Sequence, residues 1–288
     1  MSRSHIFRKV TIVGVGLMGG SLGMAIKKHQ LASEVVGLSQ HQSTLMTAIK
    51  NFAIDEGTTD LPKAIRNADL VVLATPVETI IKLLPSINLH LKRGCIVTDL
   101  GSAKQEIVEA AEKILSNPDF FVGSHPMVGS EKSGVEFAKA ELFEHSLCFM
   151  TPTAKTNQVA KEKIKYFWIK LGAQVKFLSP VEHDSIVAQI SHLPHLVAFA
   201  LMETIPQEHL EYASQGLKDS TRLAGSSPQM WSDICLSNSK NIVKSLDELI
   251  KRLSYLRKLM TNKDQKNLME HFSKARDKRN ALPPTNQP

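Results

Sequence analysis

Short apolar runs alternate with helix-like stretches through the first 179 residues of the chain. Most of the runs are continuous in Val, Ile, Leu and Phe, which is typical of strands buried on both faces of a parallel sheet. The pattern predicts strands at Val10–Val13, Val35–Leu38, Leu70–Ala74, Cys95–Asp99, Phe120–Gly123, Leu147–Thr151 and Gln174–Leu178. Strands that alternate with helices indicate an α/β fold, a Rossmann-type doubly wound parallel sheet.

The apolar pattern changes after Ser179. Ser179, Pro180 and Glu182 match a helix start with a capping serine, proline at the first helical position and glutamate at the third. The sequence that follows is helical in pattern almost to its end. We therefore predict a sheet domain over residues 1–179, an all-α C-terminal domain over residues 180–279 and a frayed tail over residues 280–288.

The first helix of the predicted α domain has a polar face and an apolar face. At about 100° per residue, Asp184, His192 and His195 fall within about 80° of one another. The opposite side carries Ile186, Ile190, Leu193, Leu196, Val197, Ala200 and Leu201. Pro194 is expected to bend the helix beside the two histidines. A metal site is not favoured, because these histidines are three residues apart and the His-Glu-x-x-His pattern is absent.

Composition excludes several classes of protein. The chain has 288 residues, of which 42% are hydrophobic and 22% charged, so a disordered or collagen-like chain is excluded. The net charge of +7 comes from residues 240–279, which carry 12 Lys and Arg against 5 Asp and Glu. Apolar residues recur at helical spacing there: Ile242, Val243, Leu246, Leu249, Ile250, Leu253, Leu256, Leu259 and Met260. We expect most of this charge to be the solvated face of a long amphipathic helix, and DNA binding is less favoured.

Cysteine usage and hydropathy indicate a cytoplasmic protein. Cys95, Cys148 and Cys235 are far apart and odd in number, so neither a zinc ribbon nor a disulfide framework is indicated. No stretch approaches the roughly 18 consecutive apolar residues of a membrane span. The N-terminus also lacks an apolar stretch long enough for a secretory signal. We therefore expect no membrane partner.

A glycine-rich loop follows the first predicted strand and leads into a helix. Gly14 permits a tight turn, Gly16 lets backbone N–H groups approach a pyrophosphate, and Gly19 allows close helix packing. A strand, this loop and a helix in that order are the context in which the G-x-G-x-x-G pattern predicts a dinucleotide-binding domain. The cofactor-binding candidates are Gly14, Gly16, Leu17, Met18, Gly19, Ser39 and Thr75.

The end of the second predicted strand bears on the choice between NAD and NADP. A carboxylate there would hold the ribose hydroxyls of NAD and repel the 2′-phosphate of NADP. Here Ser39 begins a segment without a carboxylate, which leans slightly towards NADP. No arginine or lysine stands ready to pair with that phosphate, so NAD or NADP both stay open.

Two polar residues follow predicted strands and are the catalytic candidates. Ligands collect at the carboxyl ends of strands in a doubly wound sheet, so Ser102 is expected near the nicotinamide end of a cofactor. Ser102 and Gln105 also match a capping box, which alone would explain the serine. His125 follows the Phe120–Gly123 run and precedes a proline. Its imidazole is the natural acceptor for a hydroxyl proton at neutral pH, and the alternative is a buried structural histidine.

A polar segment between Gly216 and Gly225 supplies a candidate for anion binding. Arg222 could hold a carboxylate by two parallel N–H bonds, a contact that arginine makes better than lysine. The alternative is an interdomain ion pair of Arg222 with Glu131 or Asp219.

Taken together, these motifs resemble the prephenate and arogenate dehydrogenases of tyrosine biosynthesis. The resemblance rests on the glycine loop, Asp99–Ser102, Gly123–Met127, His183-Asp184, Ser191–His195 and Asp219–Arg222. It implies that His125 accepts a hydrogen bond from the substrate's ring hydroxyl and that Ser102 helps to orient both. It also implies that Arg222 grips a substrate carboxylate, that Glu131 restrains this arginine, and that His195 lies near the side-chain end of the substrate.

The resemblance implies NAD(P)-dependent oxidative decarboxylation of prephenate to 4-hydroxyphenylpyruvate, without a metal. His195 favours prephenate over arogenate, and His192 is taken as a further substrate-binding residue. A homodimer through the helical domain is also expected. A 3-hydroxyacid dehydrogenase or a pyrroline-5-carboxylate reductase would share the fold but give no reason for His125-Pro126-Met127 together with Arg222. A cofactor-sensing regulator with a DNA-binding basic helix is the alternative from another class.

Overall fold

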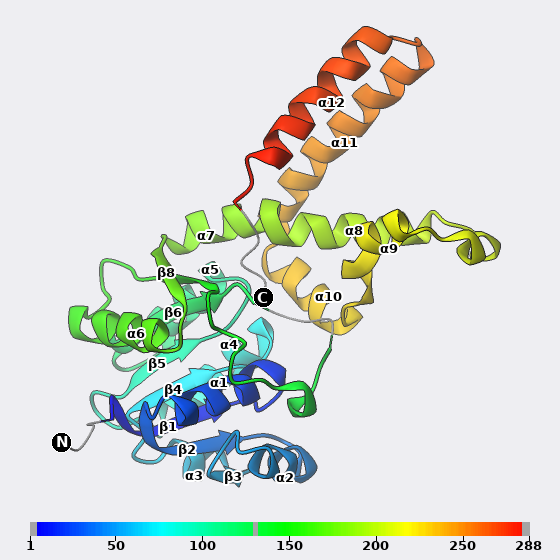
Figure 1. The fold of residues 1–288 in the computed structure, drawn as a ribbon. Helices are drawn as coiled ribbons and strands as arrows, with labels where there is room; N and C mark the ends of the chain where they lie inside the picture. The colour runs from blue at the N-terminus through cyan, green and yellow to red at the C-terminus, as the bar shows by residue number, and fades with distance from the viewer. Residues whose placement is uncertain (1–4, 129–131, 284–288) are drawn as a thin grey trace. The chain divides into compact units, whose positions relative to one another are not determined.

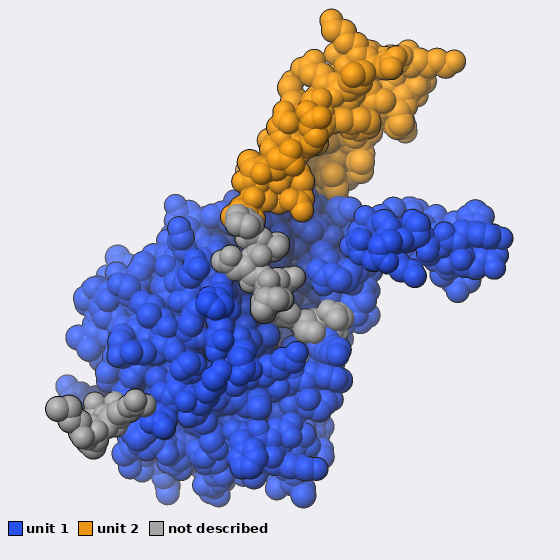
Figure 2. Space-filling model, in the orientation of Figure 1, with its two compact units in different colours: residues 1–239 blue, residues 240–288 orange. Residues whose placement is uncertain are grey.

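The computed structural model describes residues 5–128 and 132–283. Contacts between residues divide the chain into two compact units, residues 1–239 and 240–288 (Figure 2). The first unit holds the sheet and the helices that follow it as far as Ser239. We call residues up to 178 the sheet half of this unit and residues 180–239 its helical half.

An eight-stranded sheet forms the centre of the sheet half (Figure 1). Its strands are β1 Phe7–Val13, β2 Ala32–Leu38, β3 Glu56–Thr58, β4 Leu70–Leu73, β5 Ile96–Asp99, β6 Phe121–Pro126, β7 Leu147–Thr151 and β8 Gln174–Phe177. They lie in the order β3-β2-β1-β4-β5-β6-β7-β8, and every neighbouring pair is parallel except β6 and β7. The predicted doubly wound fold is confirmed.

Two features of the sheet differ from the prediction. β3 was not predicted, because Glu56-Gly57-Thr58 is short and contains no Val, Ile, Leu or Phe. β7 runs antiparallel to β6, with His125 opposite Phe149. An apolar run predicts a buried strand but carries no information about its direction.

Helices cover both faces of the sheet and enclose two apolar cores. These helices are α1 Leu17–Lys28, α2 Gln42–Lys50, α3 Leu61–Ile65, α4 Val77–Asn88, α5 Gln105–Ile114 and α6 Gln158–Lys170. One core takes side chains from α1, α2 and α6, and the other takes side chains from α3, α4 and α5. Successive residues of β4 alternate between them: Val72 belongs to the first core, and Val71 and Leu73 to the second. The strands from β2 to β7, apart from the edge strand β3, are therefore buried on both faces, which explains their continuous apolar runs, whereas the edge strand β8 is largely exposed.

The helical half begins at the predicted helix start. Ser179 Oγ accepts a hydrogen bond from Glu182 N at 3.2 Å, and the Glu182 carboxylate accepts one from Ser179 N at 2.9 Å, so the capping box is confirmed. The elements that follow are α7 Pro180–Val187, a π-helical turn Ala188–His192, α8 Leu193–Glu203, α9 Gln215–Thr221, a 3₁₀ turn Arg222–Gly225 and α10 Pro228–Ser237. The π-helical turn comes directly before Pro194, which cannot donate a backbone hydrogen bond.

The stretch Pro180–Glu203 buries three polar side chains together with Val187, Ala188 and Ala198, and leaves several larger apolar side chains exposed. His183, Asp184 and His192 are buried, whereas Ile190 is 58% exposed and Leu201 is 37% exposed. By length and mean hydropathy this stretch could span a membrane. Its buried polar groups, however, form hydrogen bonds with α5 and β6, so we interpret it as a helix of the first unit. The cytoplasmic location expected from the sequence stays a prediction.

The second unit is a pair of helices, α11 Ser239–Thr261 and α12 Gln265–Asn280. α11 confirms the long helix predicted from the apolar spacing. Asp264 caps α12 by accepting a hydrogen bond from Asn267 N at 3.2 Å, and the rings of Tyr255 and His271 lie 4.9 Å apart. Of the tail predicted from residue 280 onwards, residues 284–288 lie outside the described residues.

Candidate active site

The glycine loop adopts a conformation that its residue types make possible. Gly14 has φ = +96°, and a Cβ there would lie 2.7 Å from Thr75 Cγ2. A Cβ on Gly19 would lie 1.9 Å from the Gly14 carbonyl oxygen, so α1 can pack this closely only with glycine. A Cβ on Gly16 would meet no atom within 4 Å. The backbone at Gly16 therefore borders open space at the start of α1.

This open space suits a phosphate group. The first turn of α1, which contains Leu17 and Met18, has neither an acidic residue nor a side-chain cap, so its N–H groups are available to an anion. Gly14 N donates to the Leu38 carbonyl oxygen at 2.9 Å, which holds the loop at the carboxyl ends of β1 and β2. Thr75 follows β4 at the same edge, and its Oγ1 is buried without a hydrogen-bond partner among the described residues. The residues present therefore fit a dinucleotide.

The end of β2 carries no carboxylate. Ser39 Oγ accepts a hydrogen bond from His41 N at 3.3 Å, and Ser39 N donates to the Thr58 carbonyl oxygen. Asp60, two residues after β3, caps α3 by accepting a hydrogen bond from Lys63 N at 3.2 Å. The hydrogen-bond partners of Ser39 are backbone groups of His41 and Thr58.

A buried ion pair supports the loop that carries Ser102. Asp99 and Lys104 are fully buried and paired with each other, and Asp99 also accepts hydrogen bonds from the backbone N–H of Gly101 and of Ser124. Lys104 Nζ donates to the Ser124 carbonyl oxygen at 3.0 Å. Since Ser124 precedes His125, the pair fixes the ends of β5 and β6 against each other.

The capping role considered for Ser102 is wrong. α5 begins at Gln105, and Lys104 takes the N-cap position without a side-chain cap. The N–H groups of Lys104 and Gln105 instead donate to the Asp184 carboxylate at 2.7 and 2.9 Å. A carboxylate from α7 therefore replaces the local cap, and the half-buried Ser102 is not needed for it.

His125 lies at the end of β6 and is 8% exposed. Its Nδ1 lies 2.9 Å from His183 Nε2, and His183 Nδ1 lies 2.7 Å from Asp184 Oδ1. Burial lowers the pKa of His125 well below its usual value, and the positive charges of Lys104 and, when it is protonated, of His183 lower it further. The ring is therefore neutral at physiological pH and can accept a proton.

A second buried histidine lies on the same helical stretch. Asn238 Nδ2 donates to the Asp184 carbonyl oxygen at 2.8 Å and lies 3.2 Å from His192 Nδ1. Nδ1 is therefore the acceptor of the His192 ring, and Nε2 carries the hydrogen. His192 Nε2 is buried and has no hydrogen-bond partner among the described residues. Burial lowers the pKa of His192 to about 4.

His195 stacks on Trp231, with ring centroids 3.5 Å apart and planes inclined by 21°. His195 Nδ1 lies 2.9 Å from the Ser191 carbonyl oxygen and donates to it. The indole Nε1 of Trp231 is buried and, like His192 Nε2, lacks a hydrogen-bond acceptor within the part of the chain that is described. Burial lowers the pKa of His195, and the positive charge of Arg222 lowers it further. Arg222 therefore lies close enough to His195 for their charges to interact.

The predicted site residues thus fall into two groups within the first unit. The glycine loop, Ser39, Thr75 and Ser102 follow strands at one edge of the sheet, and His125 lies within the last residues of β6 at the same edge. His192, His195 and Arg222 belong to the helical half, and His125 is joined to that half through His183. Glu131, expected to restrain Arg222, lies outside the described residues.

His183, Asp184, Asn238 and Trp231 make contacts in the site that the sequence did not predict. His183-Asp184 belongs to the motifs that carry the resemblance, but no role follows from the resemblance for either residue. The sequence did contain a hint of such a role. Asp184 lies on the same helix face as His192 and His195, and a carboxylate that is buried on such a face needs hydrogen-bond partners. Its partners on α5, however, are about 80 residues away in the sequence.

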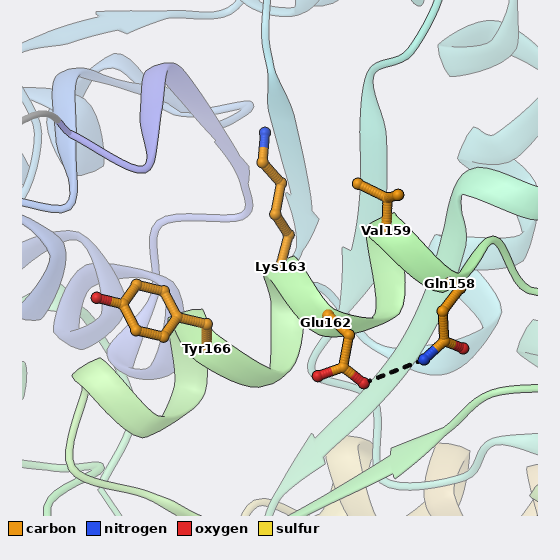
Figure 3. A pocket seen from close by; sticks show the side chains of 5 residues that line it. All are labelled: Gln158, Val159, Glu162, Lys163 and Tyr166. Carbon is orange, nitrogen blue, oxygen red and sulfur yellow. Dashed lines mark hydrogen bonds between the residues drawn. The ribbon is translucent and has the colours of Figure 1, made fainter.

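Two other features do not belong to this site. A shallow hollow on α6 is lined by Gln158, Val159, Glu162, Lys163 and Tyr166 (Figure 3). Gln158 donates to Glu162 across one turn of that helix at 3.3 Å, and no predicted site residue lies there. Among residues 5–128 and 132–283, no group of three or more His, Cys, Asp and Glu side chains is arranged to hold a metal ion.

Comparisons with known proteins agree with this arrangement. A family model described as prephenate dehydrogenase, nucleotide-binding domain, matches residues 22–177. A second, described as prephenate dehydrogenase, dimerization domain, matches residues 179–274. Prephenate dehydrogenase of Bacillus subtilis is 37% identical over 95% of this chain and 76% of that protein. Cyclohexadienyl dehydrogenase of Zymomonas mobilis is 31% identical over 96% of this chain and 97% of that protein.

A solved structure is similar over almost its whole length. Prephenate dehydrogenase from Aquifex aeolicus, in complex with hydroxyphenyl propionate and NAD+, has a TM-score of 0.90 and 35% sequence identity. The similarity covers 97% of this chain and 99% of that one. The chain therefore belongs to the prephenate dehydrogenase family of nicotinamide-dependent oxidoreductases.

Proposed function

We propose that this chain oxidatively decarboxylates prephenate to 4-hydroxyphenylpyruvate with a nicotinamide dinucleotide as hydride acceptor. The observation that carries the proposal is His125. It is a neutral imidazole at the carboxyl end of a strand, at the same sheet edge as the glycine loop and the Ser102 loop. Its Nδ1 is occupied by His183, so Nε2 is the atom left to face a substrate.

The chain's own residues handle one proton and orient the substrate. His125 Nε2 accepts the ring hydroxyl proton while the hydride leaves the same carbon. Once the opposite ring carboxylate has left as carbon dioxide, the ring is aromatic and its oxygen can take the proton back from His125. The half-buried Ser102 is proposed to hold the hydroxyl in line with the imidazole. Proton transfer of this kind contributes roughly 10² to 10⁴ in rate.

The cofactor site is proposed at the glycine loop, with the pyrophosphate on the first turn of α1. Gly14, Gly16 and Gly19 shape the loop, and the buried hydroxyl of Thr75 beside it has no hydrogen-bond partner in the described part of the chain. When bound, the nicotinamide accepts the hydride. Ser39 favours NADP slightly, because nothing charged at the end of β2 would repel a 2′-phosphate. The Aquifex aeolicus relative, in contrast, was solved with NAD+.

The helical half is proposed to hold the anionic groups of the substrate. Arg222 is the cation that would pair with a carboxylate, and it lies within electrostatic reach of His195. His192 Nε2 and Trp231 Nε1 are buried N–H donors without acceptors among residues 5–128 and 132–283, and a substrate oxygen or an ordered water would satisfy them. Prephenate is favoured over arogenate because His195 is present. Glu131 keeps its proposed role as the restraint on Arg222.

We further propose a homodimer through the helical domain, with a domain boundary at Ser179. The two family models meet between residues 177 and 179, and the second is described as a dimerization domain. The exposed apolar side chains of Pro180–Glu203 are the kind of surface that a second copy would cover: Ile190, Val197 and Leu201.

A four-way assay tests the function. Purified protein is given prephenate or arogenate with NAD+ or NADP+, and the absorbance of the reduced nicotinamide is followed. Turnover of prephenate with release of carbon dioxide supports the proposal, whereas turnover of arogenate alone would replace the substrate. The ratio of kcat/KM for the two cofactors decides the NADP preference, and Ser39→Asp should move that ratio about tenfold towards NAD.

A further inference from the structure

The hydrogen bonds around Asp184 determine which nitrogen of each neighbouring histidine carries a hydrogen. An ionised Asp184 carboxylate can only accept hydrogen bonds, and it already accepts from the backbone N–H of Lys104 and Gln105. The Nδ1 of His183, 2.7 Å from Asp184 Oδ1, must therefore donate. Burial lowers the pKa of His183, so its ring is neutral and its Nε2 is an acceptor.

The same reasoning extends to His125. His183 Nε2 accepts, so His125 Nδ1, 2.9 Å away, donates to it. In a neutral ring only one nitrogen carries a hydrogen, so His125 Nε2 has a free lone pair. In the opposite tautomer Nε2 would carry the hydrogen and could not take a proton from any substrate. The carboxylate on α7 therefore fixes the chemical state of a ring on β6 through one intervening histidine.

We propose that His183 and Asp184 are positioning residues for His125: they fix the tautomer in which Nε2 accepts the substrate's hydroxyl proton, and they stabilise the ring while it holds that proton. This inference rests on the proposed function. The protonated His125 ring would donate Nδ1–H to His183 Nε2, and the negative charge of Asp184 lies behind His183. The proton later returns to the product oxygen, so no path to solvent is needed.

The surroundings make this support necessary. His125 and His183 are buried, and Phe149 packs edge-on against the His183 ring at 5.6 Å. A positive charge on His125 therefore has little access to water and lies near a buried lysine. The titratable or charged groups that face the two rings and Asp184 from neighbouring elements are Asp99, Lys104, Glu106, Cys148 and His192. The Asp99 carboxylate is already paired with Lys104, so Asp184 is the anion bonded to the chain of rings.

Nitrogen-15 NMR of the histidine rings tests the tautomers without substrate. Protein labelled in histidine is measured at pH 7.5, and the two rings are assigned from spectra of His125→Asn and His183→Phe. We expect the Nδ1–H tautomer for both His125 and His183 in the wild type. An Nε2–H tautomer for His125 would overturn the inference. Because this measurement needs no turnover, it gives its result even if the wild type proves inactive on prephenate, an outcome that would refute only the proposed function.

Steady-state kinetics test the consequence for turnover. His183→Phe removes both ring nitrogens but leaves Asp184 bonded to the start of α5, so it is the cleaner variant. We expect kcat to fall about 10- to 100-fold, with the affinity for NAD(P)+ unchanged. The acidic limb of the pH profile of kcat/KM should move about one pH unit lower. The reason is that protonated His125 has lost the acceptor of its Nδ1–H, which lowers the pKa of its ring. His183→Gln, whose amide can both donate and accept, should recover part of kcat.

Ser179→Ala is the matched control, because it weakens the start of the same helix without touching the three side chains. We expect its acidic limb to stay in place. Asp184→Asn is a second variant, and its limb should also move to lower pH. A limb that stays at the wild-type pH in both His183→Phe and Asp184→Asn would reduce the pair to a structural role and overturn the inference.

Discussion

The two faces of the stretch Pro180–Glu203 differ in a way that runs against the usual amphipathic helix. Its polar face is buried: Asp184, His183 and His192 form hydrogen bonds with α5, β6 and Asn238. Its apolar face carries Ile190 and Leu201, which are exposed in the single chain. A soluble helix normally buries its apolar side. The buried polar face builds the candidate site, and the exposed apolar side chains fit the homodimer proposed above.

The largest effect is expected when the His125 ring, which the buried face supports, is removed. His125→Asn should fold and bind NAD(P)+, yet lose about 10² to 10⁴ in kcat, because an amide cannot take up the hydroxyl proton. Stopped-flow or steady-state rates with prephenate, and a separate cofactor titration, provide the check. His90→Asn, an exposed histidine on the sheet half, is the control. Unchanged turnover in His125→Asn would remove this histidine from the mechanism.

The role of the exposed apolar face in dimer formation can be tested separately. Leu201→Glu places a charge among the exposed apolar side chains of α8 in both copies of the proposed dimer. Because burying one leucine contributes about 1.5 to 3 kcal/mol, loss of two should raise the dimer dissociation constant by at least about 100-fold. Light scattering at micromolar concentration measures this. Leu89→Glu changes an apolar residue that is 78% exposed on the sheet half and should leave the assembly intact. Equal effects of the two substitutions would count against the proposed interface.

Acid should destabilise the buried face selectively. The pKa of His192 falls from 6.5 to about 4 on burial, so between these values the unfolded chain binds a proton that the folded chain does not. Stability therefore rises with pH across this window and is lost as the pH falls through it. The loss from His192 is about 3 kcal/mol. Urea unfolding at several pH values, compared with His192→Gln, measures it. The variant should lose less stability on acidification, and an identical pH dependence would contradict this.

The smallest effect is expected at the rim of the helical half. Arg222→Ala should chiefly raise the KM for prephenate, by about 10- to 100-fold, because a charge-assisted pair to a carboxylate is worth about 1.5 to 3 kcal/mol. The kcat should change less. Arg93→Ala, on an exposed loop before β5, serves as the control. If the KM stayed at its wild-type value, the interpretation of Arg222 as part of an ion pair within the protein would be the better one.

Local patterns in the sequence predicted much of the fold. Buried parallel strands give continuous apolar runs, so most strands could be predicted. The helix start at Ser179 could be predicted because its capping residues are four consecutive residues of the chain. The missed strand β3 is held by three neighbouring elements, β2, α2 and α3, rather than by its own composition. The direction of β7 follows from its pairing with β6, which no feature of residues 147–151 encodes.

The residues of the candidate site likewise divide into those that local sequence predicts and those that depend on distant partners. Residues at or just after the carboxyl end of a strand, such as His125 and the glycine loop, could be found because chain position alone places them at the ligand edge. Asp184 and Asn238 could not, because their roles depend on partners 79 or 54 residues away. The capping box at Ser102 failed for the same reason: a distant carboxylate competes with the local serine for the first N–H groups of α5.

The position of Asp184 limits how freely the two halves of the first unit can be recombined. Its carboxylate completes a helix that belongs to the sheet half while its own backbone belongs to the helical half. A hybrid that joined this nucleotide-binding half to the helical half of another dehydrogenase would need an acidic residue at this point. Without one, it would both fray α5 and leave the imidazole of β6 unsupported. Modular exchange at residue 179 should therefore succeed only between donors that share this aspartate.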